Sequence, residues 1–142
     1  MEDKMKIQIA TSNQEHIAGY REISIKDGRI DFQEISDNEC TYILANNILD
    51  VFPVQHTTQC VAELVKKLRL GGTLVVGGTD LRIFSLNVIN GMLQPDEASN
   101  IISSVSSMND AGTVSNIIRE MNLTIVSTQI SGVHYEISAE RK

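Results

Sequence analysis

Apolar and polar positions alternate along much of the chain with the period of a β-strand. Residues 5–10 (MKIQIA) and 20–26 (YREISIK) place apolar side chains at every second position, which predicts half-buried strands. Residues 41–45 (TYILA) predict a strand, and residues 73–76 (TLVV) are a short β-branched apolar run, typical of a strand buried on both faces. Residues 30–35 fit either a short strand or an extended connection.

Other segments repeat with the period of a helix. Apolar residues recur at i, i+3, i+4 and i+7 over residues 61–68, and Gly71 is placed to close this helix in a left-handed conformation. Residues 46–52 fit a short helical turn that ends before Pro53. Three further helices are predicted: one after an N-cap at Asp80, one beginning at Pro95 and one after an N-cap at Asp110.

The order of these elements indicates the fold class. A helix, a glycine turn and a buried strand form one half-unit of a parallel α/β sheet. The chain then ends with strand patterns over residues 123–129 and 133–138 around Ser131 and Gly132, which predict an antiparallel hairpin. We expect a single α/β domain over residues 1–142, with a mostly parallel sheet, a closing hairpin and helices on both faces.

Composition narrows the function classes. The net charge of −6 disfavours nonspecific binding to nucleic acid or to acidic membranes, and no apolar run reaches the ~20 residues of a membrane helix. Cys40 and Cys60 lack metal or redox spacing, which fits a reducing compartment and a cytoplasmic protein. The three histidines also lack metal-ligand spacing, so no metal site is predicted.

Three stretches then identify a resemblance. They are YILANNILDVFP, LVKKLRLGGTLVVGGTDL and TVSNIIREMNLTIV. Together with the order of elements, they resemble the small class I S-adenosylmethionine-dependent methyltransferases. In that superfamily they correspond to a strand with an acidic turn, an LKPGG turn that leads into a buried strand, and a late helix before the last hairpin. The resemblance implies a Rossmann-like methyltransferase fold with S-adenosylmethionine at the carboxyl ends of the first, second and fourth strands.

The resemblance also implies a role for individual residues. A loop of Ala10, Thr11, Ser12 and Asn13 stands where the family has its glycine-rich sequence, and it would face the methionine part of the cofactor. The other implied positions are Glu22 or Asp27 at the ribose, Asp37 and Asn38 on the adenine side, and Asn46 near the transferred methyl group. No catalytic base is identified.

Each of these residues also has a structural interpretation. The 10–13 loop fits an ordinary polar connection equally well, Asp27 before Gly28 is typical of a turn, and Asp80 is better explained as a helix cap. Two functions therefore remain open. One is methyl transfer to an unknown acceptor; the other is a non-catalytic methyltransferase-like module that acts through a protein partner or as a homo-oligomer, with the apolar segment 83–93 as a contact surface.

Overall fold

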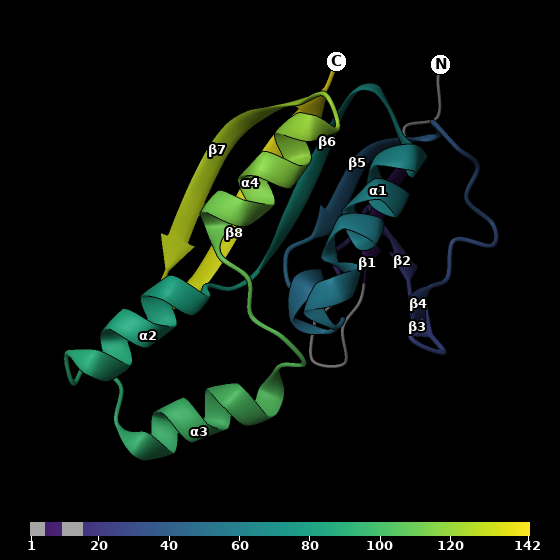
Figure 1. Cartoon of the computed structure of the whole chain (residues 1–142). Helices are drawn as coiled ribbons and strands as arrows, with labels where there is room; N and C mark the ends of the chain where they lie inside the picture. The colour runs from purple at the N-terminus through teal and green to yellow at the C-terminus, as the bar shows by residue number, and fades with distance from the viewer. Residues whose placement is uncertain (1–4, 10–15) are drawn as a thin grey trace.

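The computed structural model describes residues 5–9 and 16–142, and its centre is a six-stranded sheet in the order β2-β1-β5-β6-β8-β7 (Figure 1). β1, β2, β5 and β6 are parallel, and β8 runs antiparallel between β6 and β7. The strands of this sheet are β1 (Met5–Ile9), β2 (Arg21–Ile23), β5 (Cys40–Ala45), β6 (Leu68–Thr79), β7 (Leu123–Ser131) and β8 (His134–Arg141). The predicted fold class, a mostly parallel α/β sheet that ends in an antiparallel hairpin, is confirmed.

The helices follow the predicted order. They are two short 3-10 turns, η1 (Ile48–Asp50) and η2 (Val54–His56), and the helices α1 (Thr57–Lys67), α2 (Leu81–Ile89), α3 (Pro95–Ser104) and α4 (Ala111–Glu120). The predicted caps are present at α2 and α4, where Asp80 accepts from the Ile83 N–H and Asp110 from the Thr113 N–H. Within the described residues, no helix is apolar and long enough to cross a bilayer.

The hydrophobic core lies between the sheet and a layer formed by α1 and α4, which share one face of the sheet (Figure 1). Strand pairing places Ile7, Ile43, Leu74 and Ala139 in one row across that face, and all of them are fully buried. The helices contribute their apolar stripes, including Val61, Leu64, Val114 and Ile118. The core therefore holds the sheet to these two helices.

The predicted helical layer on the second face is not found among the described residues. Tyr42, Leu44 and Glu136 on that face are only partly buried. α2 and α3 extend beyond the carboxyl ends of the parallel strands instead of lying on the sheet (Figure 1). α3 contains no buried residue and α2 only Phe84, because neither helix packs flat against a strand.

Local boundaries differ from the prediction in two places. The strand predicted over residues 20–26 breaks at Ser24, and its second half pairs within a separate hairpin of β3 (Ile25–Lys26) and β4 (Arg29–Ile30). The helix predicted to close at Gly71 ends at Lys67, and residues 69–72 bulge from β6 because Cys40 pairs with Leu68 while Tyr42 pairs with Thr73.

Candidate functional site

The strand order reverses between β1 and β5, because β2 continues from β1 in one direction and β6 from β5 in the other. In open α/β sheets, ligands bind outside the carboxyl ends of the strands at such a reversal. Asn46 follows β5 directly and lies at this point. Ala10, Thr11, Ser12 and Asn13 follow β1 in the sequence, but they lie outside the described residues.

A pocket of about 500 Å³ lies on the same edge of the sheet, between the β3–β4 hairpin and the connection from β5 to α1. Its volume is within the range of small-molecule sites, roughly 300–1,000 Å³. Ile30, Phe52 and Cys60 contribute buried apolar surface to its walls. We call this cavity the hairpin pocket. An apolar body with a polar edge is the kind of ligand that it suits.

Charged and polar side chains surround this apolar surface. Asp27, Arg29, His56 and Glu63 are among the residues that line the pocket. Burial, with a smaller contribution from Glu63, raises the pKa of the Cys60 thiol to about 12. The thiol therefore stays protonated at neutral pH and is a poor nucleophile. The polar chemistry of the pocket comes from the carboxylates, the guanidinium and the imidazole.

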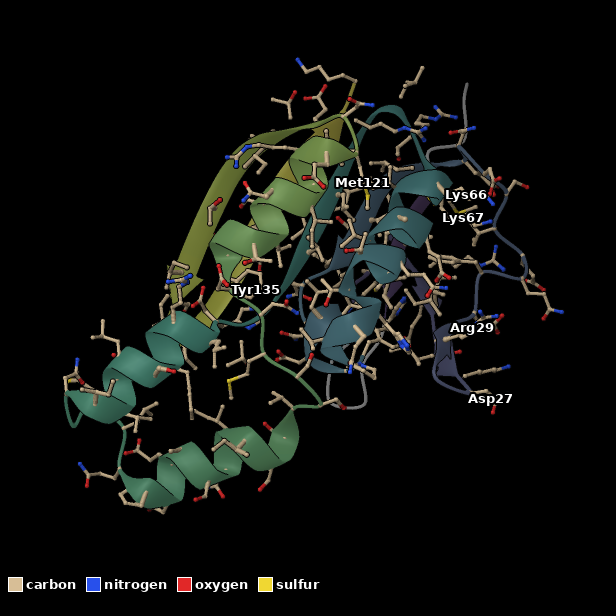
Figure 2. The ribbon with its side chains drawn as sticks, viewed as in Figure 1. Asp27, Arg29, Lys66, Lys67, Met121 and Tyr135 are labelled. Carbon is tan, nitrogen blue, oxygen red and sulfur yellow. The ribbon has the colours of Figure 1, made fainter. Side chains whose placement is uncertain are left out.

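The hairpin turn fixes Asp27 at the mouth of the hairpin pocket. Asp27 and Gly28 connect β3 to β4, and both have positive φ, 52° and 74°. This is the backbone of a two-residue hairpin turn, which Asp-Gly sequences favour. The structural interpretation of Asp27 as a turn residue is thus confirmed, and the side chain is exposed beside Arg29 at the tip of the hairpin (Figure 2).

Glu22 and Asn46 lie near this edge but do not line the hairpin pocket. Glu22 is exposed on β2 and borders a smaller polar groove with Lys26 and Glu34. Asn46 is partly buried, and its carbonyl oxygen approaches the backbone of Gly77 on β6. Of the predicted acidic ribose ligands, the structure therefore brings only Asp27 into the pocket.

Asp37 and Asn38 lie at the amino ends of the parallel strands, so the structure does not bring these two predicted adenine-side residues to the hairpin pocket. They precede β5, and the Asn38 N–H donates to the carbonyl oxygen of Lys66 at the end of α1. Lys67 Nζ donates to Asp37 Oδ1 over 2.9 Å, and this bond lowers the pKa of the Asp37 carboxyl. Lys66 and Lys67 stand at the far end of α1 from Asp27 (Figure 2).

The sequence did not predict the polar network that braces the carboxyl edge. Asp50 Oδ1 accepts from the Thr79 N–H over 2.6 Å, and Asp50 Oδ2 accepts from the Thr79 hydroxyl over 3.0 Å. The loop after α3 joins the same network, because the Ser106 N–H donates to the Asp50 carbonyl and Ser107 Oγ to the Phe52 carbonyl. These bonds hold the β5–α1 connection, one wall of the hairpin pocket, against the end of β6.

Tyr135 carries an unpaired polar atom in the core. Its side chain is 0% exposed, and its hydroxyl has no hydrogen-bond partner among the residues that the structure describes. Burial, and to a lesser degree Asp50 and Asp80, raises the pKa of this hydroxyl. Tyr135 pairs with Gly78 of β6, close to the carboxyl edge (Figure 2).

Replacing Tyr135 by phenylalanine is expected to raise the free energy of unfolding by about 1 kcal/mol. The tyrosine hydroxyl loses its hydrogen bonds to water on folding and gains none in the core, and phenylalanine avoids this cost. Urea denaturation of the two proteins measures the difference. A loss of 1 kcal/mol or more would show that a partner, such as a buried water, bonds the hydroxyl in solution.

The described residues hold no group of three or more His, Cys, Asp or Glu side chains arranged as metal ligands.

Comparisons with known proteins support this reading at the level of the fold. No family model and no curated protein sequence matches the chain. An O-methyltransferase family protein from Burkholderia thailandensis superposes with a TM-score of 0.61 at 11% identity, over 86% of this chain and 36% of that one. An S-adenosylmethionine-dependent methyltransferase from Thermotoga maritima gives a TM-score of 0.51 at 12% identity, over 87% and 65%. The chain has a methyltransferase fold.

A third structure with this fold contains ligands. The 1,6-didemethyltoxoflavin-N1-methyltransferase of Burkholderia thailandensis, solved with bound 1,6-didemethyltoxoflavin and S-adenosylhomocysteine, gives a TM-score of 0.51 at 12% identity, over 75% of this chain and 46% of that one. In all three comparisons the chain spans less than two thirds of the other protein. At these identities, the likeness establishes the methyltransferase fold and leaves activity to be tested.

Proposed function

We propose that this chain is a methyl-transfer domain that binds S-adenosylmethionine at the carboxyl edge of β1, β2 and β5. The observation that carries the proposal is the hairpin pocket, a 500 Å³ cavity on the edge where the strand order reverses. Its apolar walls suit a planar base, and an exposed carboxylate at Asp27 can accept hydrogen bonds from ribose hydroxyls. The residues present therefore fit a nucleoside.

The chain's own contribution is to bind and orient the ligands. The bound cofactor supplies a reactive sulfonium, while the protein aligns the acceptor with it and excludes water. Asp27 would hold the ribose, Asn46 would stand at the switch point near the transferred methyl group, and the 10–13 loop would cover the methionine part. The Asp50–Thr79 bonds would keep the pocket wall in place during binding. The methyl acceptor is an organic molecule or a protein partner.

Thermal unfolding with S-adenosylmethionine and S-adenosylhomocysteine tests the proposal. A ligand at 100 times its dissociation constant should add about 2.7 kcal/mol to the free energy of unfolding. Asp27→Asn is the informative variant, because asparagine tolerates the positive φ of this turn and removes only the charge. We expect it to weaken binding about tenfold, a difference of ~1.4 kcal/mol, with little change in the melting temperature of the free protein.

Asp37→Asn is the matched control, since it makes the same chemical change at the amino ends of the parallel strands, away from the hairpin pocket. It should leave the ligand-induced shift intact. Equal weakening by the two variants, or no shift with either ligand at millimolar concentration, would contradict cofactor binding in the hairpin pocket.

A non-catalytic binding module is the second candidate, and the connection from β1 to β2 favours it. Parallel strands are normally joined by a crossover of at least a dozen residues that contains a helix. Here only residues 10–20 are available, and residues 18–20 form a turn and a bend. A connection of this length offers a cofactor less contact surface than a full crossover does. Absence of any thermal shift would favour this function.

A further inference from the structure

The two outermost strands of the main sheet, β2 and β7, are built differently. β2, at one edge, has only three residues, and two of them are the charged Arg21 and Glu22. β7, at the other edge, has nine residues, LTIVSTQIS, with no charge, proline or glycine. Short or charged edge strands prevent pairing between molecules, whereas a long uncharged strand offers its free N–H and C=O groups to another strand. Only the β2 edge is protected in this way.

β7 is also exposed along most of its length. Leu123 is its only buried residue, and the side chains of Val126 and Ile130 are 64% and 49% exposed. A register shift between Ile125 and Ser127 interrupts its pairing with β8, and pairing is then regular from Ser127 to Ser131. Residues 127–131 therefore present a regular, uncharged backbone edge.

We propose that β7 pairs antiparallel with β7 of a second copy of this chain, across a two-fold axis. An identical strand is self-complementary in this arrangement, so that one surface serves both partners. The chain carries a net charge of −6, and an uncharged strand is a surface where two copies meet without like charges opposite one another. The pairing would also cover Val126 and Ile130, which a single copy leaves exposed.

The surface beside β7 combines apolar side chains with the charged Arg82, Asp110 and Arg119. Ile130 shares a surface hollow with Ile83 of α2, and the end of β7 lies next to α2 (Figure 1). The exposed apolar side chains of α2 include Leu81, Leu86 and Ile89. Helix α2 contains much of the segment 83–93, which the sequence predicts to be a contact surface. It would enlarge the contact made by β7. The hairpin pocket adjoins the opposite, β2 side of the sheet, so pairing through β7 would leave both pockets open.

Light scattering coupled to size-exclusion chromatography tests this inference. We expect twice the 15.7 kDa mass of one chain. Thr128→Lys places a charge on the exposed edge and, near the two-fold axis, opposite its own copy, so it should raise the dimer dissociation constant at least about tenfold. Thr58→Lys, the same change at an exposed position of α1, should leave the mass unchanged. Thermal melting of both variants shows that they are folded.

Cysteine cross-linking tests whether the two β7 strands pair in the antiparallel arrangement. Cys40 and Cys60 are buried, so a cysteine introduced at position 128, 129 or 130, in the middle of the regular edge, would be the exposed thiol among the described residues. Because the middle of an antiparallel pair faces itself, at least one of these variants should form a disulfide-linked dimer on oxidation. A monomer at every concentration, a dimer that Thr128→Lys does not weaken, or no cross-link from any of the three positions would overturn the inference.

Discussion

Replacing Gly77 by alanine is expected to lower the free energy of unfolding by roughly 3 kcal/mol or more. A Cβ at this position would stand 2.2 Å from the Tyr135 carbonyl oxygen and 2.7 Å from the Asn46 carbonyl oxygen. Both are backbone atoms, one in strand β8 and the other in the residue that follows β5, so relief requires the backbone on both sides of β6 to move apart. Urea denaturation measures the loss, and circular dichroism shows whether the variant still folds.

Gly78→Ala is the matched control, one residue along the same strand. Its Cβ would meet Asp50 Oδ1 at 2.9 Å, a side-chain atom that can move, although the move strains the bonds to Thr79. We expect a smaller loss, of about 1–2 kcal/mol. If the two alanines cost the same, the close packing of backbone at Gly77 does not hold in solution.

This close approach also explains why Gly77 matters for the candidate site. It places the end of β6 beside the end of β5, where Asn46 begins the connection at the switch point. The sequence alone left two explanations for Gly77 and Gly78, either the approach of a ligand or a bend of the strand. The structure identifies a third, which is contact with neighbouring protein atoms.

Local patterns predicted most of the fold. The alternating run before Ala10, the apolar runs of β5 and β6 and the final hairpin all form strands of the main sheet. Asp80 and Asp110 cap helices as expected, because a cap depends only on the residue and its next three neighbours. Such features are encoded within a few residues, and they can be read without knowledge of the tertiary structure.

The errors arose where placement depends on distant pairing. If residues 30–35 had formed a strand of the main sheet, Asp37 and Asn38 would have followed its carboxyl end. Instead the hairpin β3–β4 forms a separate sheet, and the chain then returns to the amino end of β5. The alternation of residues 20–26 did not reveal that Ser24 separates two sheets, because each half keeps the period of a strand.

The hydrogen-bond network around Asp50 could not be predicted from local sequence either. Asp50 and Thr79 are 29 residues apart in the chain, and Ser107 is 55 residues from Phe52. Nothing in the local sequence distinguishes these polar residues from ordinary turn formers. Sequence reasoning therefore predicted a site at the carboxyl ends of the strands, but not the contacts that shape the pocket there.

Replacing Asp80 by alanine is expected to lower the free energy of unfolding by about 3 kcal/mol. Asp80 is 4% exposed; its Oδ1 accepts from the Ile83 N–H over 3.0 Å and its Oδ2 from the Ala111 N–H over 2.9 Å. One carboxylate thus serves the first turns of both α2 and α4. Alanine would leave two donors unpaired, and each such donor costs about 1–3 kcal/mol when it is buried.

Asp110→Ala separates burial from capping, because Asp110 caps α4 through the Thr113 N–H in the same way but is more accessible to water. Water can replace the lost acceptor there, so we expect a loss of about 1 kcal/mol. Chemical denaturation of both variants compares the two costs. A larger loss at Asp80 means that the carboxyl edge is closed to solvent where α2 and α4 begin. Equal losses would mean that water reaches the Asp80 donors, and that this edge of the sheet is open.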